Sequence, residues 1–322
     1  MALLPAGLAA ATVAGARGLD RSWRAPVPLT AVDTSWAAVA GGLAWRPGAC
    51  EGAVVWVPEA FTRWTVQVPG PCPAVSTGRG VSAVAATAYP VERVAFLSFV
   101  GGNTREWRLW TATQTARRPR LLRTASADAG SPSPIVLGDA GQDGIVYAVG
   151  REVVVLGANG RRVLTWHAPA RVVAVTDGPG RLAVTRSDGS VDVVAARGGA
   201  VLFRAAHSPG DVLEAVPFLT GVAVETSGGL EVDLQNGAVT DLDVGRGAHL
   251  VGYAEGRLAY RRGNELRLVS WRTRKDVLLR RLRPGAFASY DLRGLAWTSG
   301  RTLCWATAIY ADRGAHPNAP GC

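Results

Sequence analysis

Gly180 to Ala206, GRLAVTRSDGSVDVVAARGGAVLFRAA, is the stretch that decides the fold of this chain. Two glycine turns, Asp188-Gly189 and Gly198-Gly199, divide it into three short apolar segments, which are typical of strands. The predicted strands are Leu182–Thr185, Val191–Ala195 and Val201–Ala205. Because a few isolated antiparallel strands cannot bury their apolar faces, this segment is expected to stack on copies of itself.

The first strand of this stretch contains a three-residue apolar motif, here called the strand word. It recurs along the chain every 36 to 51 residues, close to the length of a β-propeller blade. The word predicts seven units of four strands each. Its positions are Leu43-Ala44-Trp45, Val94-Ala95-Phe96, Ile145-Val146-Tyr147, Leu182-Ala183-Val184, Val222-Ala223-Val224, Leu258-Ala259-Tyr260 and Leu295-Ala296-Trp297.

Each word is expected to lie in the second strand of its unit, after a leading strand and before a third and an outer strand. The third strands are predicted at Val54–Val57, Glu106–Ala112, Glu152–Leu156, Val191–Ala195, Leu230–Leu234, Leu266–Trp271 and Arg301–Ala308. The last unit lacks an outer strand of its own. Trp23–Thr30 can supply it, because the edge of a sheet tolerates Pro26 and Pro28, and the N-terminal segment would then close the ring.

Two segments resemble known propeller repeats. Thr185 to Val194, TRSDGSVDVV, is similar to the hairpin of WD40 blades without the closing Trp-Asp pair, and Gly144 to Trp166 resembles the quinoprotein type of repeat. The resemblance implies a β-propeller, and with the seven words the predicted fold is an all-β, seven-bladed propeller of four-stranded antiparallel blades. It implies architecture and says little about function. A two-sheet β-sandwich with large insertions is the alternative fold.

Composition agrees with many short strands. The chain has 322 residues with 39 glycines and 19 prolines, both of which weaken helix interiors, and 48% of its residues are hydrophobic. Its net charge of +10 rests almost wholly on arginine, a bias typical of a GC-rich, bacterial genome. The arginines are scattered and show no basic cluster with interleaved aromatic residues, so nucleic acid is not an expected partner.

Residues 1–16, MALLPAGLAAATVAGA, resemble the later part of a signal peptide, although a positively charged start is missing. We therefore expect an apolar leader at 1–16, a propeller at 17–312 and a tail at 313–322. A secreted or cell-envelope location is favoured over a cytoplasmic one. No run reaches the ~18 apolar residues of a membrane span, and a monomer is expected.

Four cysteines, an even number, suggest two disulfides in an exported chain. We expect Cys50 to pair with Cys72, since both fall on one face of the first unit. Cys304 is expected to pair with Cys322 and so to hold the proline-rich tail over the closing unit. The alternative is four unrelated thiols in a cytosolic protein.

Motifs for metal or cofactor chemistry are weak. The four histidines, His167, His207, His249 and His316, are scattered and are expected to be surface residues. Asp139 and Asp143 partly resemble a calcium loop but offer too few oxygen ligands, so an ordinary turn is expected. No cofactor is predicted. The tryptophans are expected to pack between blades, with a sugar-stacking platform as the alternative.

One pattern of charge repeats. Arginines follow the strand word in six units and could form an anion-attracting face; they are Arg46, Arg105, Arg151, Arg186, Arg261 with Arg262, and Arg301. The chain is therefore predicted to be an exported, non-catalytic binding or assembly module that holds a protein or an anionic ligand through its face loops. The alternative is an extracellular hydrolase or lyase that uses acids at the channel mouth, with Asp188, Glu225 and Asp291 as candidates.

Overall fold

The structure is a computed structural model of the whole chain. It describes residues 21–24, 36–39, 42–45, 53–57, 62–66, 79–86, 93–138, 144–157, 159–254, 256–284, 286, 288–291, 294–299 and 302–307. These ranges consist of strands, turns and loops. Among the described residues there is no helix with the length and apolar character needed to cross a membrane.

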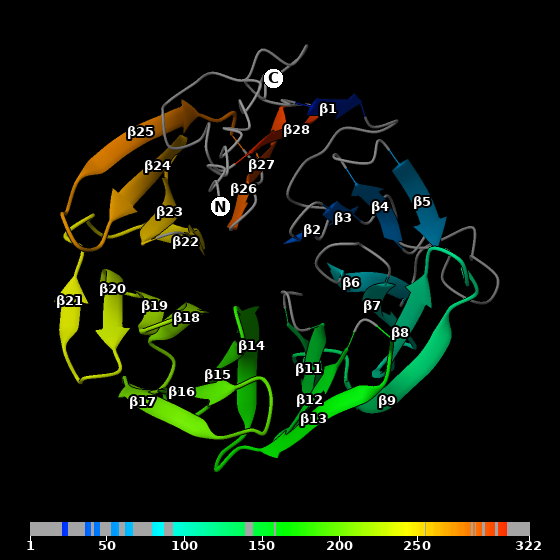
Figure 1. Ribbon diagram of the computed structural model, residues 1–322. Helices are drawn as coiled ribbons and strands as arrows, with labels where there is room; N and C mark the ends of the chain where they lie inside the picture. Colours follow the sequence, from blue (N-terminus) through cyan, green and yellow to red (C-terminus); the bar gives the residue numbers. More distant parts are fainter. Residues whose placement is uncertain are drawn as a thin grey trace, which may run out of the picture.

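Five antiparallel sheets of four strands and one sheet of eight, arranged as a ring, make up the described part of the fold (Figure 1). Within each four-stranded sheet the strands follow one another in chain order. The first sheet contains β2 (Trp36–Val39), β3 (Gly42–Trp45), β4 (Ala53–Val57) and β5 (Thr62–Val66). The second contains β6 (Arg79–Ala86), β7 (Arg93–Val100), β8 (Thr104–Thr113) and β9 (Arg120–Asp128). The third contains β10 (Ile135–Leu137), β11 (Ile145–Val149), β12 (Glu152–Leu156) and β13 (Arg162–His167).

The next two sheets have the same order. One contains β14 (Val172–Gly178), β15 (Arg181–Arg186), β16 (Ser190–Ala195) and β17 (Val201–Ala206). The other contains β18 (Val212–Phe218), β19 (Gly221–Thr226), β20 (Gly229–Leu234) and β21 (Val239–Asp241). The predicted strands of the opening stretch are thus confirmed as β15, β16 and β17, each within two residues of its predicted bounds.

The remaining strands form one sheet of eight, in the order β1-β28-β27-β26-β22-β23-β24-β25. Its strands are β22 (Ala248–Ala254), β23 (Arg257–Arg262), β24 (Glu265–Ser270), β25 (Asp276–Arg281), β26 (Ala288–Asp291), β27 (Gly294–Ser299), β28 (Thr302–Thr307) and β1 (Arg21–Arg24). A single parallel pair, Gly252 with Tyr290, joins its two antiparallel halves. The strand β1 pairs with β28, with Arg21 opposite Trp305. The N-terminal strand therefore lies a few residues before the predicted Trp23–Thr30, and Pro26 and Pro28 lie outside the described residues.

All seven copies of the strand word lie in the second strand of a four-strand series, in β3, β7, β11, β15, β19, β23 and β27. The side chains of the strand word are buried in β7, β11, β15, β19, β23 and β27, because neighbouring sheets pack against each other. Val153, Val154 and Val155 of β12 are at most 1% exposed, which is typical of a strand between two sheets. One core cluster joins Phe96 of β7 to Tyr147 of β11, so the core lies between consecutive sheets.

An irregularity repeats in the strands nearest the centre of the ring. The pairing of each of β6, β14, β18 and β22 with the next strand skips one residue near its start. The residues left out of the register are Ser82, Val173, Leu213 and Val251. Such bulges re-aim side chains at sheet rims. Val173 and Leu213 are 48% and 55% exposed, which is unusual for large apolar side chains on inner strands.

Candidate functional site

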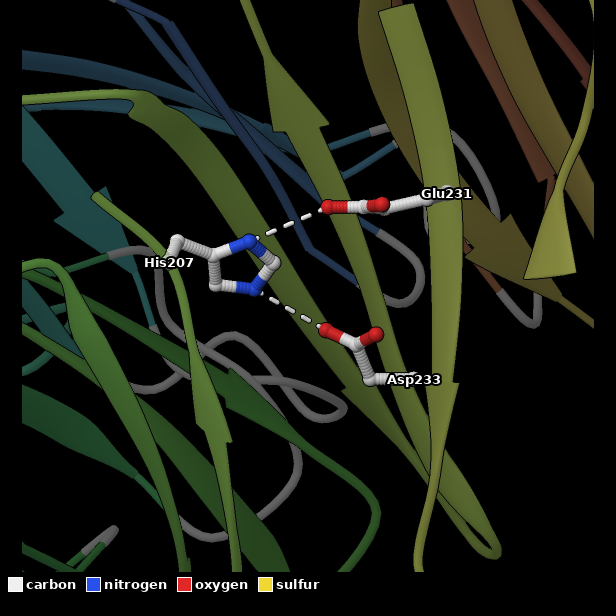
Figure 2. A group of neighbouring side chains, drawn as sticks. All are labelled: His207, Glu231 and Asp233. Atoms are coloured by element: carbon white, nitrogen blue, oxygen red, sulfur yellow. Dashed lines mark hydrogen bonds and ion pairs between the residues drawn. The ribbon is translucent and has the colours of Figure 1, made fainter. Parts of the chain in front are cut away.

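Three ionisable side chains, His207 from the link after β17 and Glu231 and Asp233 from β20, lie close together (Figure 2). Glu231 and Asp233 lie two residues apart on β20, so the alternation of a strand places both carboxylates on one face. The other face of β20 carries Leu230 and Val232, which are at most 1% exposed and fix the strand in the core. The two carboxylates are therefore held on a rigid element.

His207 approaches this face from the link between β17 and β18. The backbone of His207 packs closely against the β15–β16 turn. Gly189 of this turn has a φ of +87°, and a Cβ atom added there would lie 2.4 Å from the His207 carbonyl oxygen. Ahead of it, Gly210 has a φ of +77° and the Asp211 amide donates to the Ser208 carbonyl at 3.1 Å. The link therefore forms a tight turn that points the imidazole at β20.

The imidazole lies between the two carboxylates. Its Nδ1 is 3.1 Å from Oε1 of Glu231, and its Nε2 is 3.0 Å from Oδ2 of Asp233. Exposed fractions of the side chains are 8% for His207, 24% for Glu231 and 6% for Asp233, so the cluster opens to solvent on the Glu231 side. The prediction that His207 is a surface residue is therefore wrong, because the link folds onto the neighbouring sheet.

The local charge is negative although the chain as a whole is positive. Burial raises the pKa of Asp233, with His207 opposing the shift. Burial, followed by repulsion from Asp233, raises the pKa of Glu231, and Asp211 and Asp241 add to this repulsion. The Ser227 hydroxyl donates to Asp211 and lowers the pKa of that carboxyl. Several acids thus surround one imidazole, which is an arrangement suited to a cation.

The other histidines differ from His207. His249 is 66% exposed, and its Nδ1 lies 2.8 Å from Oε1 of Glu225, a single carboxylate. His167 is exposed on β13, and both of these agree with the surface reading. His316 lies outside the described residues, as do Asp139 and Asp143 of the calcium-like loop.

The acids considered for catalysis are placed as follows. Glu225, at the end of β19, is 5% exposed; its Oε1 contacts His249 and its Oε2 accepts a hydrogen bond from the Leu250 amide at 2.7 Å. Asp188 lies in the β15–β16 turn and is half-exposed, and Asp291 ends β26. These three acids belong to three different four-strand series.

The arginines of the predicted anion-attracting face have varied surroundings. Arg186 is 3% exposed, and its Nε lies 3.2 Å from Oδ2 of Asp192, so its charge is neutralised inside the protein. Arg105 stacks on the Phe99 ring at 4.8 Å. Arg261 donates to the carbonyl of Gly263 at 2.7 Å and to that of Ala286.

Arg151 is exposed and donates through Nε to the Ala168 carbonyl at 2.8 Å. Arg262 donates to the Val244 carbonyl at 3.2 Å. Arg46 and Arg301 lie outside the described residues. An anion-attracting face stays a prediction. Arg186 already pairs with the buried carboxylate of Asp192.

Cys304 is fully buried in β28, opposite Trp297 of β27. Cys50, Cys72 and Cys322 lie outside the described residues. Both predicted disulfide pairings stay predictions.

Comparison with known proteins identifies the fold of the chain. No protein-family model matches the chain, and no curated protein matches its sequence. Solved structures of WD40-type propellers are similar to it. A chain of the structure titled "Crystal Structure of Mitotic Checkpoint Complex" is 13% identical with a TM-score of 0.56, and the match covers 89% of this chain and 91% of that one. The structure of U3-55K is 12% identical with a TM-score of 0.56, covering 89% of this chain and 98% of that one. The chain has a WD40-like β-propeller fold.

Proposed function

We propose that this chain is an exported, non-catalytic protein-binding scaffold, built as a seven-bladed propeller that β1 closes as the outer strand of the last blade. Support for the architecture comes from the seven strand words, each in the second strand of its series, and from the β1–β28 pairing. An experimental structure of the chain tests the count, and six or eight blades would refute it.

The observation that carries the binding role is the repeated bulge on the inner strands. Val173 and Leu213 occupy the same position on the neighbouring strands β14 and β18, and each is about half exposed. Both residues follow the links between sheets, so they lie on the face that also carries the β15–β16 and β19–β20 turns. Adjacent exposed apolar side chains at corresponding positions are typical of contact surfaces.

The occupant that fits this face is a protein segment with apolar side chains at its centre and acidic ones around them. Apolar side chains would pack on Val173 and Leu213, as in the core of an interface. The net charge of +10 and the exposed Arg151 favour an acidic rim on the partner. The WD40-type fold supports the proposal in general terms, because it offers several loops on one face.

Site-specific photo-crosslinking tests this proposal. A photoreactive residue at Leu213 should give one discrete adduct in the native host, and Leu213→Asp or Val173→Asp should abolish binding of the captured protein. Val239 on the outer strand β21 is the matched control, since it is 64% exposed but lies on the side wall of the ring. Equal adducts from Leu213 and Val239, or binding unchanged by both aspartates, would refute the proposal.

Export and the monomeric state are further parts of the proposal. The leader at 1–16 and the four cysteines support export. Fractionation of the native host with N-terminal sequencing should place a shortened chain outside the cytoplasm, and a full-length cytoplasmic chain would contradict export. Sedimentation of the purified chain should give the mass of one copy.

A further inference from the structure

We infer that His207, Glu231 and Asp233 form a binding site for a divalent transition-metal ion of the zinc type, which would tie the link leaving the β14–β17 sheet to strand β20 of the next sheet. The ligand atoms of the three side chains all lie within 4.8 Å of one another. One imidazole nitrogen with two carboxylates is a donor set that Zn²⁺ accepts.

A single ion fits here only if a carboxylate moves, because the two short contacts involve different ring nitrogens: Glu231 lies beside Nδ1 and Asp233 beside Nε2 (Figure 2). Ring nitrogen and carboxylate oxygen are 3.0 Å and 3.1 Å apart in the two pairs, whereas two ligands ~2 Å from one tetrahedral ion are about 3.3 Å apart. The ion would replace one hydrogen-bonded proton of the imidazole. The carboxylate on that side would move aside from the N–H direction, and the second carboxylate would turn toward the ion, since the three ligand atoms lie within 4.8 Å of one another. The other ring nitrogen would keep its N–H.

Positioning of the donors favours binding. Both carboxylates project from one face of β20, and His207 is fixed by the tight turn of its link, so little order has to be gained. The cluster is mostly buried, yet Glu231 is 24% exposed, which leaves one side open to an entering ion and to a water ligand. Three protein ligands with one open position are known for zinc sites that keep a bound water.

The excess of negative charge in the cluster also favours binding of a cation. Two carboxylates outweigh the single imidazole, and Asp211 and Asp241 add negative potential at Glu231. A divalent cation would neutralise this excess. Ca²⁺ fits less well, because it takes six to eight oxygen ligands, whereas this site offers three side chains of which one is a nitrogen donor.

The test uses the full chain, stripped with a chelator and titrated with ZnCl₂ in a calorimeter. Wild type should bind one ion that His207→Ala abolishes, and Glu231→Gln should weaken binding at least about tenfold. His249→Ala is the matched control, because among the described residues His249 contacts the single carboxylate of Glu225, and this variant should bind as wild type does.

The chain also contains cysteines, which bind zinc, so each variant is measured beside wild type under reducing conditions with and without thiol alkylation. Glu231→Gln keeps the test open if His207→Ala does not fold, since Glu231 is the most exposed of the three side chains. Absence of binding to the folded, alkylated wild type would overturn the inference, and so would binding that both variants leave unchanged. Neither result depends on the crosslinking at Leu213.

Discussion

Among the described charged residues, Asp192 is predicted to be the one whose replacement destabilises the fold most. It lies on β16 with 0% exposure, and two arginines reach it: Arg186 Nε lies 3.2 Å from Oδ2 and Arg204 Nε lies 2.6 Å from Oδ1. Arg204 is 48% exposed, whereas Arg186 is 3% exposed. Replacing Asp192 with Ala would therefore leave the Arg186 guanidinium buried, with the half-exposed Asp188, 3.4 Å away, as its remaining carboxylate.

The expected loss of stability follows from the burial of Arg186, which is much deeper than that of Arg204. Removing one partner of a buried ion pair costs about 3–5 kcal/mol, because the other charge stays without compensation. We expect Asp192→Ala to lower the free energy of unfolding by that amount. Asp188→Ala should cost no more than about 1 kcal/mol, since Asp188 is 46% exposed and solvent screens its charge.

The assay is urea unfolding followed by tryptophan fluorescence, with circular dichroism as the second probe. A double variant separates the lost pair from the lost volume: Arg186→Met with Asp192→Leu removes both buried charges, and it should recover most of the stability that Asp192→Ala loses. An Asp192→Ala variant within about 1 kcal/mol of wild type would refute the reasoning. A double variant less stable than Asp192→Ala would also refute it.

Two further predictions concern a phenol and a glycine. Burial and the hydrogen bond donated to Asp276 at 2.8 Å raise the pKa of Tyr260 to about 12, so its stabilising contribution is complete below the ordinary tyrosine pKa and is lost as the pH rises through about 12. Ultraviolet titration should show one phenol, absent from Tyr260→Phe, that ionises last while the chain stays folded; ionisation of every tyrosine near the ordinary value would contradict this. Gly252 has a φ of +155°, and a Cβ atom would lie 1.8 Å from the Tyr290 carbonyl oxygen. Gly252→Ala should therefore cost at least about 3 kcal/mol in urea unfolding, whereas Gly237→Ala, with a φ of +85° in open space, should cost about 1 kcal/mol; equal costs would refute the steric argument.

The sequence predicts much of the fold because the strands and turns of each repeat are encoded by residues that are close together in the chain. The word Leu182-Ala183-Val184 and the turn at Asp188-Gly189 mark strands and turns through neighbours only, and β15 and β16 appear within one residue of the expected positions. The N-terminal strand β1 begins at Arg21, two residues before the predicted Trp23, and the predicted edge residues Pro26 and Pro28 lie outside the described residues.

The site could be predicted only in part. Glu231 and Asp233 alternate within a predicted strand, which is a visible signal that both share one face. The position of His207 depends on how tightly its link turns onto the next sheet, and such contacts between distant segments leave no periodic mark in a sequence. The burial of Arg186 was hidden from the sequence for the same reason. Its position after a strand word suggests an exposed side chain, whereas its buried partner Asp192 lies on the neighbouring strand.

The pairing of β1 with β28 joins residues that are separated by almost the entire chain, since Arg21 lies opposite Trp305. A ribosome releases the N-terminal strand long before its partner exists, so β1 has to wait through the synthesis of every other sheet. Each earlier sheet needs only its own hairpins and the sheet before it. Assembly is therefore expected to proceed in the order of translation, and this one long-range pairing sets the final, slowest step.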